Sequence, residues 1–136
     1  MLHPSIKITH ASVVSGSARG RSIGVPTLNI ALSSAPEELT SGIYACLILF
    51  DGKTYKGAMH FGPRPVFRDT ETFEIHVLDA VIDAPPTTVD LEIIARIRDI
   101  ENFPNVEALK KAIEGDISST RAILDKYENT PETALS

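Results

Sequence analysis

The distribution of apolar and polar residues predicts β-strands over the first two-thirds of the chain and one helix over the last third. Residues 6–14 are β-rich, and 43–50 and 53–61 are two further β-rich runs separated only by Asp51-Gly52. Asp-Gly between two such runs indicates a tight hairpin, because both central positions of a type I′ turn require a positive φ. The pattern therefore predicts an early strand followed by a two-stranded hairpin.

Two later segments alternate between apolar and polar positions. In residues 73–79 one face carries Phe, Ile and Val, while Glu74 and His76 lie on the other face. Residues 89–98 alternate in the same way, and 62–65, with two prolines, are expected to form a rigid turn. Strands at this spacing are typical of a small barrel or sandwich joined by hairpins.

After Pro104-Asn105 the apolar spacing becomes helical, and Asn105 is the predicted N-cap. The apolar stripe comprises Val106, Leu109, Ala112, Ile113, Ile117 and Leu124. A helix with one such stripe must pack against the strands. We expect one domain over residues 1–127 and a disordered tail over residues 128–136.

The segment from Ser15 to Thr27 interrupts this order with a Gly-rich loop that has no apolar periodicity. Its glycines recur at every fourth position, at Gly16, Gly20 and Gly24. Glycine lets backbone N–H groups approach an anion closely, and Arg19 and Arg21 add positive charge. From the residues alone, a mobile surface loop and a phosphate-binding loop are equally good interpretations.

Four side chains outside the glycines are candidates for chemistry. Thr27 offers a hydroxyl to a magnesium ion, and Asn29 offers an amide oxygen on the same face if the chain there is extended. Glu74 is either a carboxylate on the wet side of a strand or a general base held rigidly by the sheet. Arg98, next to Asn102-Phe103, stacks on a flat ligand or clamps the strand-to-helix corner, and the residues favour the clamp.

Composition narrows the class of protein. The chain has 136 residues, 43% hydrophobic and 23% charged, which fits one globular domain. A net charge of −5 without a basic stripe argues against nucleic acid as a partner. No apolar run reaches the ~20 residues that span a bilayer, so we expect a cytoplasmic protein. The lone Cys46 lies in an apolar run and is expected to be a buried, inert thiol.

The segment Gly16–Asn29 resembles the signature of riboflavin kinases, G-x-x-x-G-R-x-(L/I)-G-x-P-T-x-N, with Pro26 and Thr27 in place. The resemblance continues in order through residues 42–45, 60–67, 74–79 and 98–116, and covers about residues 11–125. It implies a small six-stranded antiparallel Greek-key β-barrel with a C-terminal α-helix. It also implies transfer of the γ-phosphate of Mg-ATP to riboflavin, giving FMN and ADP.

The resemblance further implies a role for individual residues. The nucleotide phosphates would be bound by Gly16, Arg19, Gly20, Arg21, Gly24, Pro26, Thr27 and Asn29. Of these, Thr27 and Asn29 would also hold Mg²⁺. Glu74 would deprotonate the ribityl hydroxyl, and the flavin side would carry Arg98, Asn102 and Phe103. A linked or separate FAD adenylyltransferase is the implied protein partner.

Several positions depart from the family pattern. His60 stands where the motif has Asn, Val66 where it has Thr, and Ala80 where it has an aromatic residue, while Pro85-Pro86 replaces Tyr-Gly. The alternative function is therefore a catalytically weak flavin- or nucleotide-binding regulatory module. Because Thr27, Asn29 and Glu74 are all retained, the sequence favours the active kinase.

Overall fold

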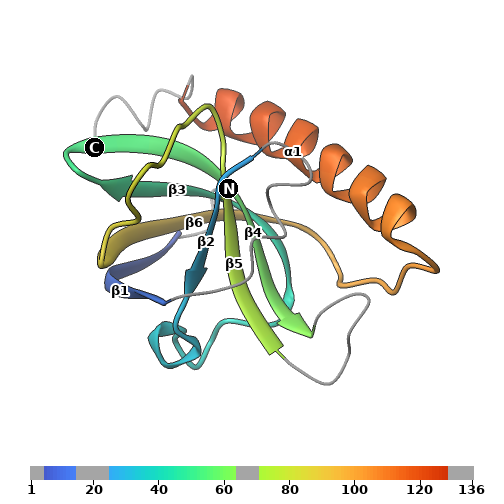
Figure 1. The fold of residues 1–136 in the computed structure, drawn as a ribbon, viewed down its shortest axis with the longest axis horizontal. Helices are drawn as coiled ribbons and strands as arrows, with labels where there is room; N and C mark the ends of the chain where they lie inside the picture. The colour runs from blue at the N-terminus through green and yellow to red at the C-terminus, as the bar shows by residue number, and fades with distance from the viewer. Residues whose placement is uncertain (1–4, 15–24, 64–70, 129–136) are drawn as a thin grey trace.

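A computed structural model describes residues 5–14, 25–63 and 71–128, which form a closed β-barrel with one long helix packed on its outside (Figure 1). The strands are β1 (Ile6–Val14), β2 (Thr27–Ile30), β3 (Gly42–Phe50), β4 (Lys53–Pro63), β5 (Glu71–Val77) and β6 (Thr88–Arg98). A 3₁₀ turn, η2 (Leu32–Ser34), follows β2, and the C-terminal helix is α1 (Val106–Glu128). In the described ranges, no helix is long and apolar enough to cross a membrane.

The barrel is a Greek key. Its strand order is β1-β2-β5-β4-β3-β6, every neighbouring pair is antiparallel, and β6 returns to β1 to close it. Strands β3, β4 and β5 follow one another as hairpins, and β6 then crosses back to lie beside β3, which is the defining order of that motif. The expected fold class is confirmed.

Local predictions hold for the central hairpin and need correction beside it. Asp51 and Gly52 have φ values of 52° and 74°, as a type I′ turn requires. The rigid turn predicted over residues 62–65 is wrong in its first half, because Gly62 and Pro63 continue β4 and pair with β5. Proline is tolerated there because Pro63 is the last residue of the strand.

Strand β2 was not predicted from the pattern, since its four residues are too few to show a period. It exists because Leu28 and Ile30 point into the barrel, where each is 3% exposed. The ladder to β5 continues beyond the strand, with the Val77 amide donating to the Pro26 carbonyl at 2.9 Å. Burial of two side chains and pairing on both sides therefore hold this short segment in the barrel wall.

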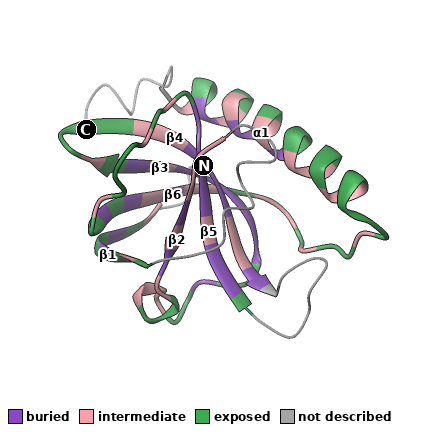
Figure 2. Ribbon diagram, viewed as in Figure 1, coloured by how far each residue is buried: buried purple, intermediate pink, exposed green. Residues whose placement is uncertain are grey.

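Alternate residues of all six strands fill the barrel interior. Figure 2 shows buried positions along the strands of the barrel wall. Strand β5 contributes Phe73, Ile75 and Val77, as their shared face predicted. Cys46 is fully buried among the interior residues, and this burial raises the pKa of its thiol to about 12, so the thiol stays protonated. The prediction that Cys46 is buried is confirmed.

Helix α1 covers the outer face of β3 and β4, and it has its own thin apolar layer. Buried residues that alternate with the interior ones lie there: Ile43, Ala45, Ala58, Leu78 and, from the helix, Leu124. Asn105 caps the helix as predicted, since its Oδ1 accepts the Ala108 amide at 2.8 Å. The described part of the helix runs to Glu128, and residues 129–136, where the disordered tail is expected, lie outside the described part of the chain.

The helix face that meets the barrel matches the predicted apolar stripe only in part. Val106 is 63% exposed, because the first turn projects beyond the barrel (Figure 1). The most buried helix residues are Asp116, Thr120 and Leu124, spaced one turn apart, and of these Leu124 belongs to the predicted stripe. Asp116 lay outside the stripe, because its burial depends on an ionic partner from a distant strand.

That partner is Arg98, at the end of β6. Its Nε and one terminal nitrogen donate to the two carboxylate oxygens of Asp116, each at 2.8 Å. The side chains are 23% and 9% exposed, so this bidentate pair is the least exposed of the ion pairs that fasten α1. A second ion pair on the helix joins Lys56 to Asp125 at 2.7 Å. It is more exposed to solvent, since the aspartate is 62% exposed.

We predict that Asp116→Asn destabilises the domain by about 2–3 kcal/mol, because it leaves a partly buried guanidinium without its countercharge. Asp125→Asn is the matched control on the same helix and should cost less than about 1 kcal/mol. Urea unfolding followed by far-UV circular dichroism measures both. Equal losses from the two variants would show that α1 is not fastened through Arg98.

Candidate active site

The pairing of β5 with both of its neighbours assembles a polar patch on the outer wall of the barrel. Asn29 on β2 lies directly opposite Glu74 on β5, and Glu74 lies directly opposite His60 on β4. Thr27 lies opposite His76 in the next such row. Side chains directly opposite one another in antiparallel strands have Cβ atoms about 4.5–5.5 Å apart. Five polar residues from three strands therefore share one patch.

Thr27 and Asn29 lie on the same side of β2, as expected if the segment is extended. Leu28 between them points into the core, so both polar side chains face outward. Each is half-buried. The structure thus brings together the hydroxyl, the amide oxygen and the Glu74 carboxylate that the sequence singled out.

His76 stands behind Thr27 and is 9% exposed. Its Nδ1 lies 3.2 Å from the Thr27 hydroxyl, within hydrogen-bonding distance. Burial lowers the pKa of His76 to about 4, with a further lowering by His60 and an opposing effect from Asp116. His76 is therefore neutral near pH 7, and it contacts the Thr27 hydroxyl without adding a positive charge.

His60 contacts Thr72 on β5, whose hydroxyl lies 2.9 Å from the His60 Nδ1. Thr72 is 6% exposed and also reaches the Gly62 carbonyl at 3.5 Å. Glu74 is half-buried, with His60 opposite it on β4 and His76 two residues along β5. Of the two interpretations of Glu74, a wet strand face does not hold for the whole segment, because His76 and Leu78 on the same side are buried.

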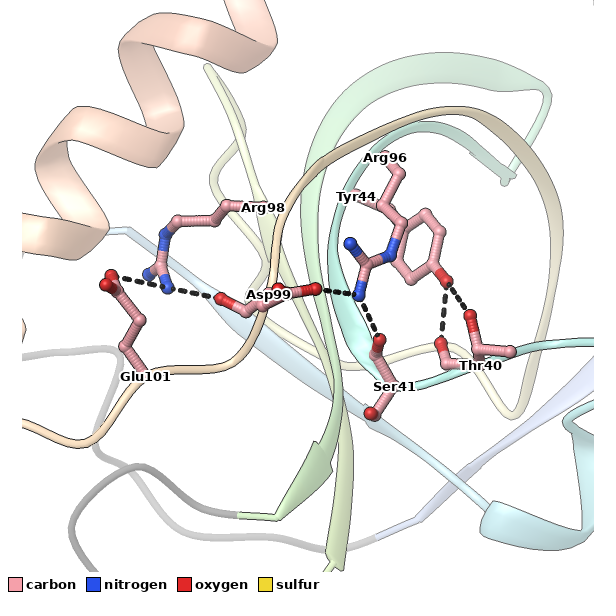
Figure 3. A network of polar contacts seen from close by, with 7 residues as sticks. All are labelled: Thr40, Ser41, Tyr44, Arg96, Arg98, Asp99 and Glu101. Carbon is pink, nitrogen blue, oxygen red and sulfur yellow. Dashed lines mark hydrogen bonds and ion pairs between the residues drawn. The ribbon is translucent and has the colours of Figure 1, made fainter.

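Arg98 and its neighbours form the corner between β6 and α1 (Figure 3). Besides Asp116, the guanidinium contacts the Asp99 carbonyl at 3.0 Å and the Glu101 carboxylate at 3.5 Å. It also lies 5.7 Å from the centre of the Phe103 ring. These contacts favour the structural clamp over stacking on a ligand, and flavin binding by Arg98, Asn102 and Phe103 stays a prediction.

A second network near this corner was missed by the sequence reasoning. One nitrogen of Arg96 donates to the Ser41 carbonyl at 2.7 Å and lies 2.6 Å from Asp99 (Figure 3). A Cβ on Gly42 would come within 2.8 Å of the Arg96 Nε, so glycine makes room for the guanidinium. The Gly-Ile-Tyr-Ala motif at residues 42–45 was the available signal. Its glycine lets the turn before β3 bind the end of β6.

The Gly-rich loop itself cannot be placed against these residues. Gly16, Arg19, Gly20, Arg21 and Gly24 lie outside the described residues, as does Val66. Pro26 is described, and its carbonyl belongs to the β2–β5 ladder. The loop joins β1 to β2, so its last residues lead directly into the strand that carries Thr27 and Asn29.

A hydroxyl and an amide oxygen on one face fit a hard cation such as Mg²⁺, which prefers oxygen ligands and keeps some of its coordination for water or phosphate. No group of three His, Cys, Asp or Glu side chains gathers to hold a metal among residues 5–14, 25–63 and 71–128. Two neutral oxygen ligands would leave most of the coordination of such an ion to water or phosphate.

Comparison with known proteins decides the family. The family model described as Flavokinase: Riboflavin kinase matches residues 5–124. The chain belongs to the riboflavin kinase family. It is 33% identical over 118 residues to the trifunctional protein RibF/MnmA of Mycoplasmoides gallisepticum, covering 86% of this chain and 18% of that protein. It is 32% identical over 113 residues to the bifunctional riboflavin kinase/FMN adenylyltransferase of Pseudomonas fluorescens, covering 82% and 36%.

Two further matches widen this picture of the family. The RNA-binding riboflavin kinase RibR of Bacillus subtilis is 30% identical, with 82% of this chain and 48% of that protein covered. Among solved structures, one titled a macrolide-efflux protein from Streptococcus pneumoniae superposes with a TM-score of 0.72 and 29% identity, over 86% of this chain and 38% of that chain. The chain thus spans less than half the length of each of these four proteins.

Burial of His76 makes stability depend on pH. Its pKa in the folded state, about 4, lies below the unfolded value of about 6.5, so the unfolded chain takes up the proton first as the pH falls. The stabilisation that comes from keeping His76 neutral is complete above the pKa of the unfolded state. It is lost as the pH falls towards the pKa of the folded state. When the pH is lowered from 7 to 4.5, we predict that the free energy of unfolding falls by about 2–3 kcal/mol less in His76→Gln than in the unchanged protein. Urea unfolding at both pH values measures this.

His10→Asn is the control for that measurement, because His10 is an exposed histidine on β1. It should lose as much stability as the unchanged protein over the same interval. A pH dependence of His76→Gln equal to that of the unchanged protein would show that the His76 proton does not couple to folding.

Proposed function

We propose that this domain is a riboflavin kinase that transfers the γ-phosphate of Mg-ATP to the 5′-hydroxyl of the riboflavin ribityl chain. The observation that carries the proposal is the register of β2 with β5, which sets Asn29 opposite Glu74 with Thr27 on the same face. A carboxylate beside two neutral oxygen ligands is the set that an alcohol-accepting phosphoryl transfer needs. Membership of the riboflavin kinase family is the basis for proposing riboflavin and ATP as the substrates.

Glu74 acts as the general base. It takes the proton of the ribityl hydroxyl as that oxygen bonds to the γ-phosphorus, the bond to the β-phosphate oxygen breaks, and ADP leaves. The carboxylate is half-buried and not enclosed, and the role asks only for a base that is ionised near neutral pH, not for a raised pKa. Its position in the middle of β5, paired on both sides, supports a fixed direction of attack.

Thr27 and Asn29 would hold Mg²⁺ together with the phosphates, and the ion would neutralise phosphate charge during transfer. The loop that leads into β2 would cover the nucleotide through backbone N–H groups of Gly16, Gly20 and Gly24 and through Arg19 and Arg21. Neutral His76 behind Thr27 supports this assignment, because it adds no positive charge that would compete with the ion.

The flavin would lie on the side of the strand-to-helix corner, with Arg98, Asn102 and Phe103. Since Arg98 is committed to Asp116, its contribution would be to hold the corner in place, and Phe103 would offer the ring surface. The relatives named as FMN adenylyltransferases suggest a linked or separate partner that uses the FMN produced. A cytoplasmic location remains part of the proposal.

The alternative is a binding module of the same family that no longer catalyses. An RNA-binding relative also exists, but the net charge of −5 gives this chain no electrostatic basis for holding phosphodiester backbones. The retained base and oxygen ligands favour the enzyme over both.

Glu74→Gln should lower FMN formation by about 10²–10⁴-fold, because the amide cannot accept the hydroxyl proton. Riboflavin and ADP binding, measured by flavin fluorescence and calorimetry, should stay near that of the unchanged protein. Glu71→Gln, the same substitution on the same strand at an exposed position, is the control and should keep its activity. A variant at position 74 that turns over normally would remove Glu74 from the mechanism.

Thr27→Val keeps the shape of the side chain and removes its hydroxyl. We expect the Mg²⁺ concentration for half-maximal FMN formation to rise about tenfold or more, as loss of one hydrogen-bonding or ligand contact to a charged group predicts. Thr9→Val, at an exposed position on β1, is the control. An unchanged Mg²⁺ dependence would place the ion elsewhere.

A further inference from the structure

We propose that His76 is the positioning residue for Thr27. Its Nδ1 accepts the hydrogen of the Thr27 hydroxyl, and the lone pairs of that oxygen are then left for a cation. The inference rests on the proposed role of Thr27 as a ligand of Mg²⁺, and it gives that ligand a supporting group in the barrel wall. The sequence alone placed His76 only beside Glu74 on one face of a strand.

The contact between the two side chains is direct. The Thr27 Oγ1 lies 3.2 Å from the His76 Nδ1, and in the described part of the chain this is the hydrogen-bond partner of the hydroxyl. The imidazole is 9% exposed, and Ala58, a small buried residue, lies opposite it on β4. A side chain packed this closely keeps one orientation, so Nδ1 is held at the hydroxyl.

The strand register keeps the two residues beside each other. Thr27 and His76 are direct partners in the β2–β5 ladder. In the next row of that ladder Leu28 pairs with Ile75, and both side chains are buried in the barrel interior. A slip of one residue would turn these two apolar side chains outward. Burial in the core therefore maintains the pairing of Thr27 with His76.

The direction of the hydrogen bond decides what the hydroxyl can offer a cation. Burial lowers the pKa of His76 to about 4, so near pH 7 the ring is neutral and has one donor and one acceptor nitrogen. If Nδ1 carried the hydrogen, it would occupy a lone pair of the Thr27 oxygen, and the hydroxyl hydrogen would point away from the ring, where a cation would approach. With the ring hydrogen on Nε2, Nδ1 accepts from the hydroxyl and the oxygen keeps its lone pairs. Only the second arrangement suits an oxygen ligand of Mg²⁺.

The first test needs neither metal nor catalysis. NMR of the histidine ring nitrogens at pH 7 distinguishes a protonated from an unprotonated nitrogen, and His76→Asn identifies the His76 signals by their loss. We expect a hydrogen on Nε2 and an unprotonated Nδ1, whose resonance shifts in Thr27→Val but not in Thr9→Val, the exposed control on β1. A hydrogen on Nδ1, or an Nδ1 resonance that is the same in Thr27→Val, would overturn the inference.

The second test measures by calorimetry how ADP binding depends on Mg²⁺ in the unchanged protein, His76→Asn and His76→Leu. Asn places an amide oxygen close to the position of Nδ1 and can still accept the hydroxyl hydrogen, whereas Leu cannot. The Mg²⁺ concentration for half of the gain in ADP affinity should rise about tenfold in His76→Leu and less than about threefold in His76→Asn, as loss of one hydrogen bond predicts. ADP affinity without Mg²⁺ should be equal in all three, which a general disruption of the site would not allow. Equal shifts in the two variants would contradict the positioning role.

A double-mutant cycle and an assay of FMN formation separate this inference from the proposed function. In the Thr27→Val background, His76→Leu should leave the Mg²⁺ dependence unchanged, because the hydroxyl on which His76 acts is gone. Additive effects of the two substitutions would overturn the inference, as would ADP binding by the unchanged protein that does not respond to Mg²⁺. If the unchanged protein binds ADP with Mg²⁺ but forms no FMN from riboflavin and Mg-ATP, the proposed kinase function fails, and the Mg²⁺ dependence still decides the role of His76.

Discussion

The antiparallel register of β5 between β2 and β4 is the constraint on which the site depends. One face of β5 buries Phe73, Ile75 and Val77 in the barrel, so the positions of Glu74 and His76 on the other face follow without further choice. A shift of one residue would drive a carboxylate into an apolar interior at a cost of several kcal/mol. The packing that stabilises the barrel is thus what sets Asn29, Glu74 and His60 in one row.

Helix α1 lies near the His76 end of the same polar patch. It covers the outer wall with Leu124 and an apolar layer, and it brings Asp116 to Arg98 and into the electrostatic surroundings of His76. Strand β5 is consequently buried on both faces near its end, while Glu74 is only half-buried. In the proposed reaction, the substrate hydroxyl would approach at Glu74. A carboxylate fixed on a rigid strand and still partly open to solvent would suit the proposed phosphoryl transfer, which depends on positioning more than on a shifted pKa.

The local order of elements could be predicted from short-range physics. Asp51-Gly52 needs positive φ, alternation over 73–77 gives the inward face, and Asn105 caps the helix, all from neighbouring residues. Strand β2 could not, because four residues carry no period and its existence depends on pairing with β1 and β5. The burial of Asp116 on α1 could not be predicted from the helical period either, because this carboxylate is buried through its pairing with an arginine 18 positions away.

The sequence by itself determined which chemical groups are available, since Thr27 and Asn29 were evident as candidate oxygen ligands and Glu74 as a candidate base before any coordinates. It did not determine that they meet, because Glu74 is separated from Asn29 by two other strands along the chain and contact between them is a property of the Greek-key closure. The tertiary structure also decided the role of Arg98. An arginine at a strand end becomes a clamp only when a helix carboxylate is folded against it.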